Sequence, residues 1–281
     1  MIQFRVRSAR AQQVLETAPY DRWVLPDGEV RAEFHCRING FLVRFPGEVD
    51  FEIEAETLAV KAWPVDAENA LIAETLFKNA ITPILVNHQG GLSLHGSAVS
   101  CEGGAIAFLG ISRSGKTTLA GAFAKFGHPF LTEDVIELVW ERDRYWVQPK
   151  ESELRLFRDS ADFLMGEQEN WQHDDEKQSI ETSDLLPFCE NAVPLCGVFI
   201  LGDDEPNEIS LAGLEPQQAL AQILPHSFIL DVEDKQRLKS HFSRLGDFAQ
   251  RCDCFSLDFP REYSQLEKIV DQICQLKLER N

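Results

Sequence analysis

The stretch that decides the fold runs from residue 105 to residue 118 and reads AIAFLGISRSGKTT. Its first five residues are an apolar run, which is typical of a parallel strand buried on both faces. The next nine, GISRSGKTT, fit the phosphate-loop pattern G-x-x-x-x-G-K-[ST] at every fixed position. Apolar side chains then recur at helical spacing as far as Phe126, and Gly127 stands where a helix would end. The order strand, loop, helix is the one that a phosphate site needs. The alternative is a glycine-rich turn with an incidental lysine.

The loop supplies the groups that a nucleotide triphosphate requires, so we expect ATP and Mg²⁺ as cofactors. Backbone N–H groups of the loop and of the first helical turn can point at phosphate oxygens, and Lys116 can neutralise their charge. The Thr117 hydroxyl can bind Mg²⁺. Arg113 stands where such loops most often have glycine, so it either restricts the backbone at positive φ or places a guanidinium beside the phosphates. The residues predicted to contact the nucleotide are Gly110, Ser112, Arg113, Ser114, Gly115, Lys116, Thr117 and Thr118.

An acidic pair is the second chemical element. Glu133 and Asp134 follow the short apolar run Phe130-Leu131, about 17 residues after Lys116. The strand after the loop helix should lie close to the loop, which would bring both carboxylates to the terminal phosphate and its metal. One can bind Mg²⁺ while the other accepts a proton from an attacking hydroxyl. We therefore predict Thr117, Glu133 and Asp134 as metal ligands and leave the division of roles within the pair open. The alternative is an acid pair on a solvated surface.

The remaining pattern predicts a mixed sheet and two domains. The segments 92–99 and 105–109 are joined by a short glycine turn, which predicts an antiparallel hairpin. Residues 1–62 resemble a series of short strands with a hairpin turn at Asn39-Gly40. Residues 65–87 have helical periodicity, with a kink expected at Pro83. We place the domain boundary after residue 88, giving a β-rich lobe (1–88) that ends in a bridging helix and a catalytic domain (89–281). The polar segment 166–184 is expected to be a mobile surface segment.

Composition limits the partners and the compartment. The 281 residues carry 46 acidic and 27 basic side chains, a net charge of −19, which disfavours nucleic acid or an anionic membrane as partner. No apolar run approaches about 20 residues, and charged residues follow Met1 closely, so we expect a cytoplasmic protein. Seven cysteines with scattered spacing are expected to be free thiols. Cys252 and Cys254 are the one close pair, read as packed thiols in preference to a metal site.

The order Leu94-His95-Gly96, phosphate loop, then Gly127 through Asp134 resembles the catalytic domain of HPr serine kinases, which share their core with ATP-dependent phosphoenolpyruvate carboxykinases. The later segments 154–160 and 257–261 look like a divergent branch found beside peptide-modification genes. The resemblance covers roughly residues 90–275 and implies an α/β fold, a phosphate-loop kinase domain with a mixed sheet, plus the smaller β-rich N-terminal lobe. It implies that Asp134 is the general base, that His95 lies near the transferred phosphate, and that Lys116 binds the β- and γ-phosphates.

Members of this family phosphorylate a serine on a protein or peptide, which makes an ATP-dependent serine kinase the expected activity. Thr118 stands where the bacterial enzymes carry glutamate, Arg113 replaces a glycine, and the glycine-rich signature of their phosphorylase activity is missing. Dephosphorylation is therefore not expected, and the divergent branch implies a small peptide as substrate, with the C-terminal serine of a ribosomally made precursor as one candidate. The alternatives are a regulatory nucleotide-binding module and a small-molecule kinase.

Three assignments stay open in the sequence. His95 taken alone is either catalytic or a packed strand histidine, and Arg155 and Lys177 either reach a substrate anion or are solvated or paired cations. Residues 1–62 are either a lobe that docks an extended peptide at a strand edge or a contact between copies of the chain.

Overall fold

The protein is described by a computed structural model that covers residues 2–25, 27–150, 153–166, 178–181, 186–204 and 206–276. The chain divides into two compact units. Unit 1 comprises Met1–Gln89 and Ile229–Leu238, and unit 2 comprises Gly90–Phe228 and Lys239–Asn281. The sequence placed a boundary after residue 88 and assigned everything beyond it to one domain. In the structure the segment 229–238 packs with unit 1 instead, since the Tyr20 hydroxyl of that unit donates a hydrogen bond to the Leu230 carbonyl.

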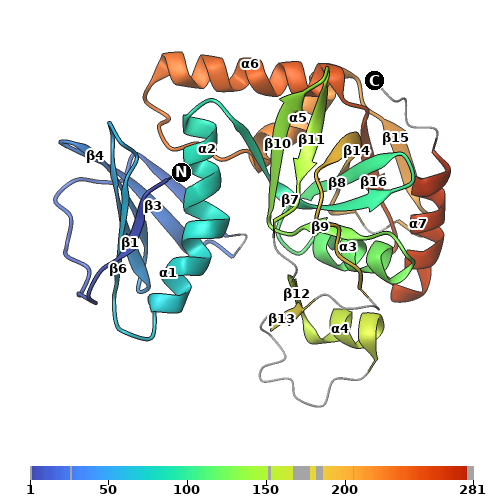
Figure 1. Ribbon diagram of the computed structural model, residues 1–281, viewed down its shortest axis with the longest axis horizontal. Coiled ribbons are helices and arrows are strands. Elements are labelled where there is room, and N and C mark those ends of the chain that lie inside the picture. The colour runs from blue at the N-terminus through green and yellow to red at the C-terminus, as the bar shows by residue number, and fades with distance from the viewer. Residues whose placement is uncertain are drawn as a thin grey trace. The chain divides into compact units, whose positions relative to one another are not determined.

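Unit 1 is built on a six-stranded sheet with strand order β1-β6-β5-β4-β3-β2. Strands β2 to β6 are antiparallel neighbours in chain order, and β1 pairs parallel to β6 (Figure 1). The β3–β4 hairpin lies where the sequence expected it, although Arg37 pairs with Gly40, so Ile38 and Asn39 form the turn. The strand bounds are β1 (Phe4–Val6), β2 (Asp21–Val24), β3 (Val30–Arg37), β4 (Gly40–Phe45), β5 (Val49–Glu54) and β6 (Val60–Pro64).

The helical segment of unit 1 changes from α-helical to π-helical geometry shortly before Pro83. Helix α1 (Ala70–Leu76) continues through a π-helical turn, η1 (Phe77–Ile81), into α2 (Thr82–His88). Pro83 falls in the first turn of α2, and the N–H of the preceding Thr82 donates to the Phe77 carbonyl, five residues back. Where the sequence predicted a kink at Pro83, the structure has a π-helical turn immediately before it. All three segments belong to unit 1.

Unit 2 contains a mixed eight-stranded sheet in the order β11-β10-β7-β8-β14-β16-β15, with β9 paired to β7. The mixed α/β architecture and the antiparallel β7–β8 hairpin predicted from the sequence are confirmed. Strands β8, β14 and β16 are parallel, and β11 also pairs with β14. The bounds are β7 (Leu92–Cys101), β8 (Gly104–Gly110), β9 (Phe130–Thr132), β10 (Val135–Glu141), β11 (Arg144–Gln148), β14 (Val193–Leu201), β15 (Ser210–Gly213) and β16 (Cys254–Asp258).

Helices cover this sheet on two sides (Figure 1). One core lies beneath α3, α4 and α7 and contains Phe108 and Phe123, and the other lies beneath α5 and α6 and contains Leu109 and Phe248. Strand β8 contributes side chains to both cores and is buried along its whole length, as the apolar run predicted. The bounds are α3 (Lys116–Lys125), α4 (Arg158–Met165), α5 (Pro216–Ile223), η2 (Leu224–His226), α6 (Lys235–Arg251), η3 (Tyr263–Gln265) and α7 (Leu266–Gln275).

Three further observations complete the fold. Strands β12 (Glu153–Leu156) and β13 (Gln178–Glu181) form a separate antiparallel pair. Most of the polar segment 166–184, including Lys177, lies outside the described residues. Within the described part of the chain, no helix combines the length and the apolar character that crossing a membrane would require.

Candidate nucleotide-phosphate and metal site

The loop between β8 and α3 contains residues with positive φ. Gly115 is the N-cap of α3 and has φ of +91°, which is the left-handed region that glycine adopts without steric cost. Arg113 also has a positive φ, +65°, in the left-handed region that glycine adopts most easily. A non-glycine residue pays roughly 1–2 kcal/mol for that conformation, and such cost is typically tolerated at functional sites. Its guanidinium carbon lies 5.8 Å from the centroid of the Phe157 ring.

Two further residues of the loop, Gly110 and Ser114, are closely packed against each other. A Cβ added to Gly110 would lie 2.6 Å from the Ser114 hydroxyl and 2.9 Å from a backbone oxygen, so only glycine fits there. Ser114 is buried, and its hydroxyl has no hydrogen-bond partner among the described residues. A buried hydroxyl without a partner is costly, and a phosphate oxygen would satisfy it. Ser112, by contrast, is exposed.

Lys116 is held inside the loop. Its side chain is buried, and its ammonium group donates hydrogen bonds to the carbonyl oxygens of Gly110 (2.9 Å) and Ile111 (2.8 Å). These contacts fix a positive charge at the amino end of α3, where the helix dipole also favours an anion. Thr118 lies next along the helix, and its hydroxyl shares a 2.9 Å hydrogen bond with the hydroxyl of Ser160 on α4. A nucleotide contact by Thr118 would have to compete with that bond.

The structure brings the acidic pair to the start of α3. Glu133 and Asp134 connect β9 to β10, and the Thr117 hydroxyl donates a hydrogen bond to Glu133 Oε1 at 2.8 Å. The other carboxylate oxygen of Glu133 accepts the backbone N–H of Arg155 at 2.5 Å. The sequence expected proximity because the strand after the loop helix should lie beside the loop strand. In the structure the parallel neighbour of the loop strand β8 is β14. Strand β9, which precedes the acidic pair, instead pairs with β7, the other neighbour of β8.

Asp134 has a left-handed backbone conformation and contacts two other candidate residues. Its φ of +60° lies in a region that aspartate adopts more readily than most residues other than glycine. Its carbonyl oxygen lies 2.9 Å from Nδ1 of His95, and because a carbonyl only accepts, the imidazole must carry its proton on Nδ1. The Asp134 carboxylate lies 3.4 Å from a guanidinium nitrogen of Arg155. Arg155 is therefore the paired cation that the sequence offered as one of its two alternatives.

Two residues distant in sequence also reach this site. His226, on η2, is buried, and burial lowers its pKa to about 4, with the charges of His95 and Lys116 acting in the same direction. Arg261 donates a hydrogen bond to the Gly202 carbonyl at 2.7 Å, and its guanidinium lies 3.7 Å from where a Cβ on Gly115 would be. No local pattern marks either residue. Arg261 was noted only within a segment that carried the family resemblance, and His226 was missed.

The arrangement defines a mixed α/β protein in which a strand, a tight glycine loop and a helix present a buried lysine beside a Thr–Glu pair. No protein-family model matches the chain, and a search of curated proteins found no match. Among solved structures, the Hpr(Ser) kinase/phosphatase from Coxiella burnetii aligns with 56% of this chain and 91% of its own, at 15% identity and a TM-score of 0.28. A likeness at that score carries no argument about activity, so the functional conclusion rests on the geometry of the site.

Proposed function

We propose that the protein is an ATP- and Mg²⁺-dependent kinase that transfers the γ-phosphoryl group to a serine or threonine hydroxyl of a peptide or protein. The observation that carries the proposal is the hydrogen bond between Thr117 and Glu133. It joins the phosphate-loop helix to the acidic pair, although 16 residues separate the two in the chain. This contact supports the proposal that the phosphate-binding residues and the metal-binding residues act together.

The residues of the loop fit a triphosphate. The buried Ser114 hydroxyl lacks a hydrogen-bond partner among the described residues, and Lys116 holds its charge at the amino end of a helix. Backbone N–H groups at that end add further donors. Together these groups would bind the phosphates and set the direction in which the terminal phosphate points.

The Thr117 hydroxyl and the Glu133 carboxylate fit Mg²⁺. Thr117 and Glu133 offer neighbouring oxygen atoms, and hydroxyl and carboxylate oxygens are the ligands that this hard cation prefers. When bound, Mg²⁺ neutralises charge on the transferring phosphoryl group. Because Glu133 also accepts the Arg155 amide, its carboxylate is held in place before any ligand arrives.

We assign Asp134 the role of general base. Its backbone carbonyl accepts a hydrogen bond from His95, which orients the residue, and its carboxylate lies beside Arg155, where it would accept the proton of an incoming hydroxyl. Arg155 is partly exposed and would exchange its weak contact with Asp134 for a negative group of the acceptor or nucleotide. In this account His95 positions Asp134, and Asp134 takes the proton.

The acceptor is proposed from chemistry and from the family resemblance. A net charge of −19 favours a neutral or basic peptide over an acidic one. The sheet of unit 1 ends in the edge strands β1 and β2, and an extended peptide can add to such an edge. We include the C-terminal serine of a ribosomally made precursor peptide as the first acceptor to test. A contact between copies of the chain is the alternative use of unit 1.

The test is phosphoryl transfer from labelled ATP, with Mg²⁺, to serine-containing peptides and to a panel of small hydroxyl and carboxylate metabolites. We expect a phosphopeptide from the parent protein, and Asp134→Asn should still bind ATP while its transfer falls by about 100-fold or more. Asp159→Asn is the matched control, since that carboxylate lies in the first turn of α4, where it accepts the Ser160 backbone N–H, and its replacement should leave transfer unchanged. Label in a metabolite alone would indicate a small-molecule kinase. Tight ATP binding with no acceptor modified would favour a regulatory nucleotide-binding module. The Thr118 hydroxyl, which is already bonded to Ser160, and the arginine at position 113 are compatible with that alternative.

A further inference from the structure

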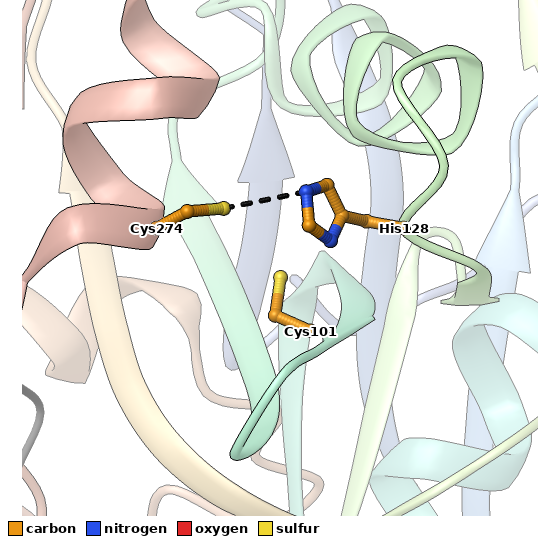
Figure 2. A group of neighbouring side chains, drawn as sticks. All are labelled: Cys101, His128 and Cys274. Carbon is orange, nitrogen blue, oxygen red and sulfur yellow. Dashed lines mark hydrogen bonds between the residues drawn. The ribbon is translucent and has the colours of Figure 1, made fainter.

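A second group of ligand-type side chains lies away from the phosphate loop. Cys101, His128 and Cys274 come from three different elements of unit 2, and their ligand atoms all lie within 4.8 Å of one another. Figure 2 shows both sulfur atoms facing the imidazole ring, one from the end of β7 and one from α7. Nothing in the proposed kinase chemistry uses these three residues.

Local structure fixes each of them in place. Cys101 is the last residue of β7 and pairs with Gly104 across the hairpin turn. His128 follows Gly127, which ends helix α3 in the left-handed conformation with φ of +93°. Its backbone N–H donates to the carbonyl of Phe123, and its ring packs 5.6 Å from the Phe123 ring. The imidazole is therefore held by the helix terminus and by an aromatic neighbour.

Cys274 lies beside the buried face of α7. Its neighbour Ile273 is in the core, whereas Cys274 itself is exposed at the edge of the helix. Its sulfur lies 3.4 Å from Nε2 of His128. The three side chains line a surface pocket of about 330 Å³, so the group is accessible from solvent.

These separations match those of ligands around one tetrahedral ion. With Zn–S near 2.3 Å and Zn–N near 2.0–2.1 Å, two ligands of a tetrahedral zinc site lie about 3.6 Å (S to N) or about 3.8 Å (S to S) apart. The observed 3.4 Å between the Cys274 sulfur and the His128 nitrogen is close to the first value. Because the Cys101 sulfur lies within 4.8 Å of both of these atoms, it would have to move by at most about 1 Å to reach a tetrahedral position. Rotation about a cysteine χ1 provides that much.

We propose that Cys101, His128 and Cys274 bind one Zn²⁺, with the fourth position open to the surface pocket. Two thiolates and one imidazole are a soft donor set that selects zinc and excludes Mg²⁺, which the oxygen donors of the kinase site select. The zinc links α7 and the β7–β8 hairpin to the carboxyl end of α3. The phosphate loop precedes the amino end of the same helix, which is about 15 Å long. It therefore stabilises the helix that presents the loop without taking part in transfer.

The test uses the full-length protein, treated with chelator and reductant and then titrated with Co²⁺ and with Zn²⁺. We expect one Co²⁺ per chain with a sulfur-to-cobalt charge-transfer band, its displacement by Zn²⁺, and a higher melting temperature with zinc. Cys274→Ser and His128→Gln should each weaken binding by more than about 100-fold, since loss of outer contacts to such ligands already costs roughly 10–100-fold. Cys189→Ser is the matched control, because that half-buried thiol lies outside the group.

Cys274 is exposed, so its replacement by serine buries no polar group, and circular dichroism of each variant confirms folding. The proposal is wrong if the reduced parent takes up no stoichiometric metal, or if Cys274→Ser and Cys189→Ser bind equally well. Finding Cys101 and Cys274 joined as a disulfide in the isolated protein, with no zinc uptake after reduction, would overturn it in favour of a redox pair. Both results are independent of whether the protein transfers phosphate.

Discussion

The contact between Thr117 and Glu133 can be tested without any ligand. We consider Thr117→Val, which removes the hydroxyl donor at nearly constant volume, and Glu133→Ala, which removes the acceptor. The Glu133 carboxylate accepts hydrogen bonds from the Thr117 hydroxyl at 2.8 Å and from the Arg155 amide at 2.5 Å. The two substitutions should therefore be coupled, and the size of the coupling measures how firmly the site is assembled in advance.

The magnitude follows from the charge and burial of Glu133. A hydrogen bond to a charged group contributes about 1.5–3 kcal/mol, and because Glu133 is half-buried we take the lower end of that range. Thr117→Val should then cost about 1.5 kcal/mol of unfolding free energy, and Glu133→Ala, which also strands the Arg155 amide, about 3 kcal/mol. The double variant should be about as stable as Glu133→Ala alone, because the hydrogen bond between the two side chains is already absent from Glu133→Ala. The coupling energy is thus about 1.5 kcal/mol.

The assay is urea unfolding of the four proteins in a double-mutant cycle. The matched control is the exposed pair Thr57 and Glu54 in unit 1, whose hydroxyl-to-carboxylate hydrogen bond should give a coupling below about 0.5 kcal/mol. If the coupling between Thr117 and Glu133 is no larger than that of the control, the two side chains do not form this hydrogen bond in solution. The acidic pair would then not be joined to the loop helix.

Three further predictions concern other parts of the structure. Burial lowers the pKa of His226 from 6.5 to about 4, so an unfolded chain takes up a proton on this residue at a higher pH than the native protein does. The stability that His226 contributes above pH 6.5 is lost as the pH falls toward 4, by up to about 3 kcal/mol, and urea unfolding of His226→Gln should show a flatter pH dependence over that window. Gly110→Ala should abolish ATP binding, because the added methyl would collide with Ser114, and binding at the parent affinity would contradict the loop geometry. Arg44 and Asp50 form a buried bidentate pair with both contacts at 2.8 Å, so Asp50→Asn should lower the unfolding free energy by about 3–5 kcal/mol, and a loss under about 1 kcal/mol would be inconsistent with that burial.

The sequence predicted those parts of the fold that depend on neighbours in the chain. The apolar run of β8, the end of α3 at Gly127 and the short turn between β7 and β8 are all local signals, and each element lies where expected. What the sequence did not predict depends on contacts between distant segments. The pairing of β11 with β14 and the packing of residues 229–238 with unit 1 are set by tertiary structure, for which no local periodicity exists.

In the candidate site, too, some contacts could be predicted from the sequence and others could not. Thr117 and Glu133 were expected to act together, and the structure brings them into contact, although by a route through β7 that the parallel-sheet argument did not foresee. The role of the Arg155 amide could not be predicted, because a backbone donor carries no residue-type signal. His226 was missed for a related reason, since its place beside His95 and Lys116 arises only after the sheet and η2 have packed.

The most direct test of the nucleotide site is calorimetric titration of the parent protein and of Lys116→Met with ATP, in the presence and absence of Mg²⁺. We expect one ATP per chain, tighter binding with Mg²⁺, and a loss of at least about 100-fold in the variant, because a charge 4 Å from a phosphate contributes about 4 kcal/mol at the effective dielectric of a partly buried site. Circular dichroism should show that Lys116→Met remains folded. Failure of the parent to bind ATP, or equal affinity in the two proteins, would contradict the assignment of the loop at the start of α3 as the nucleotide site.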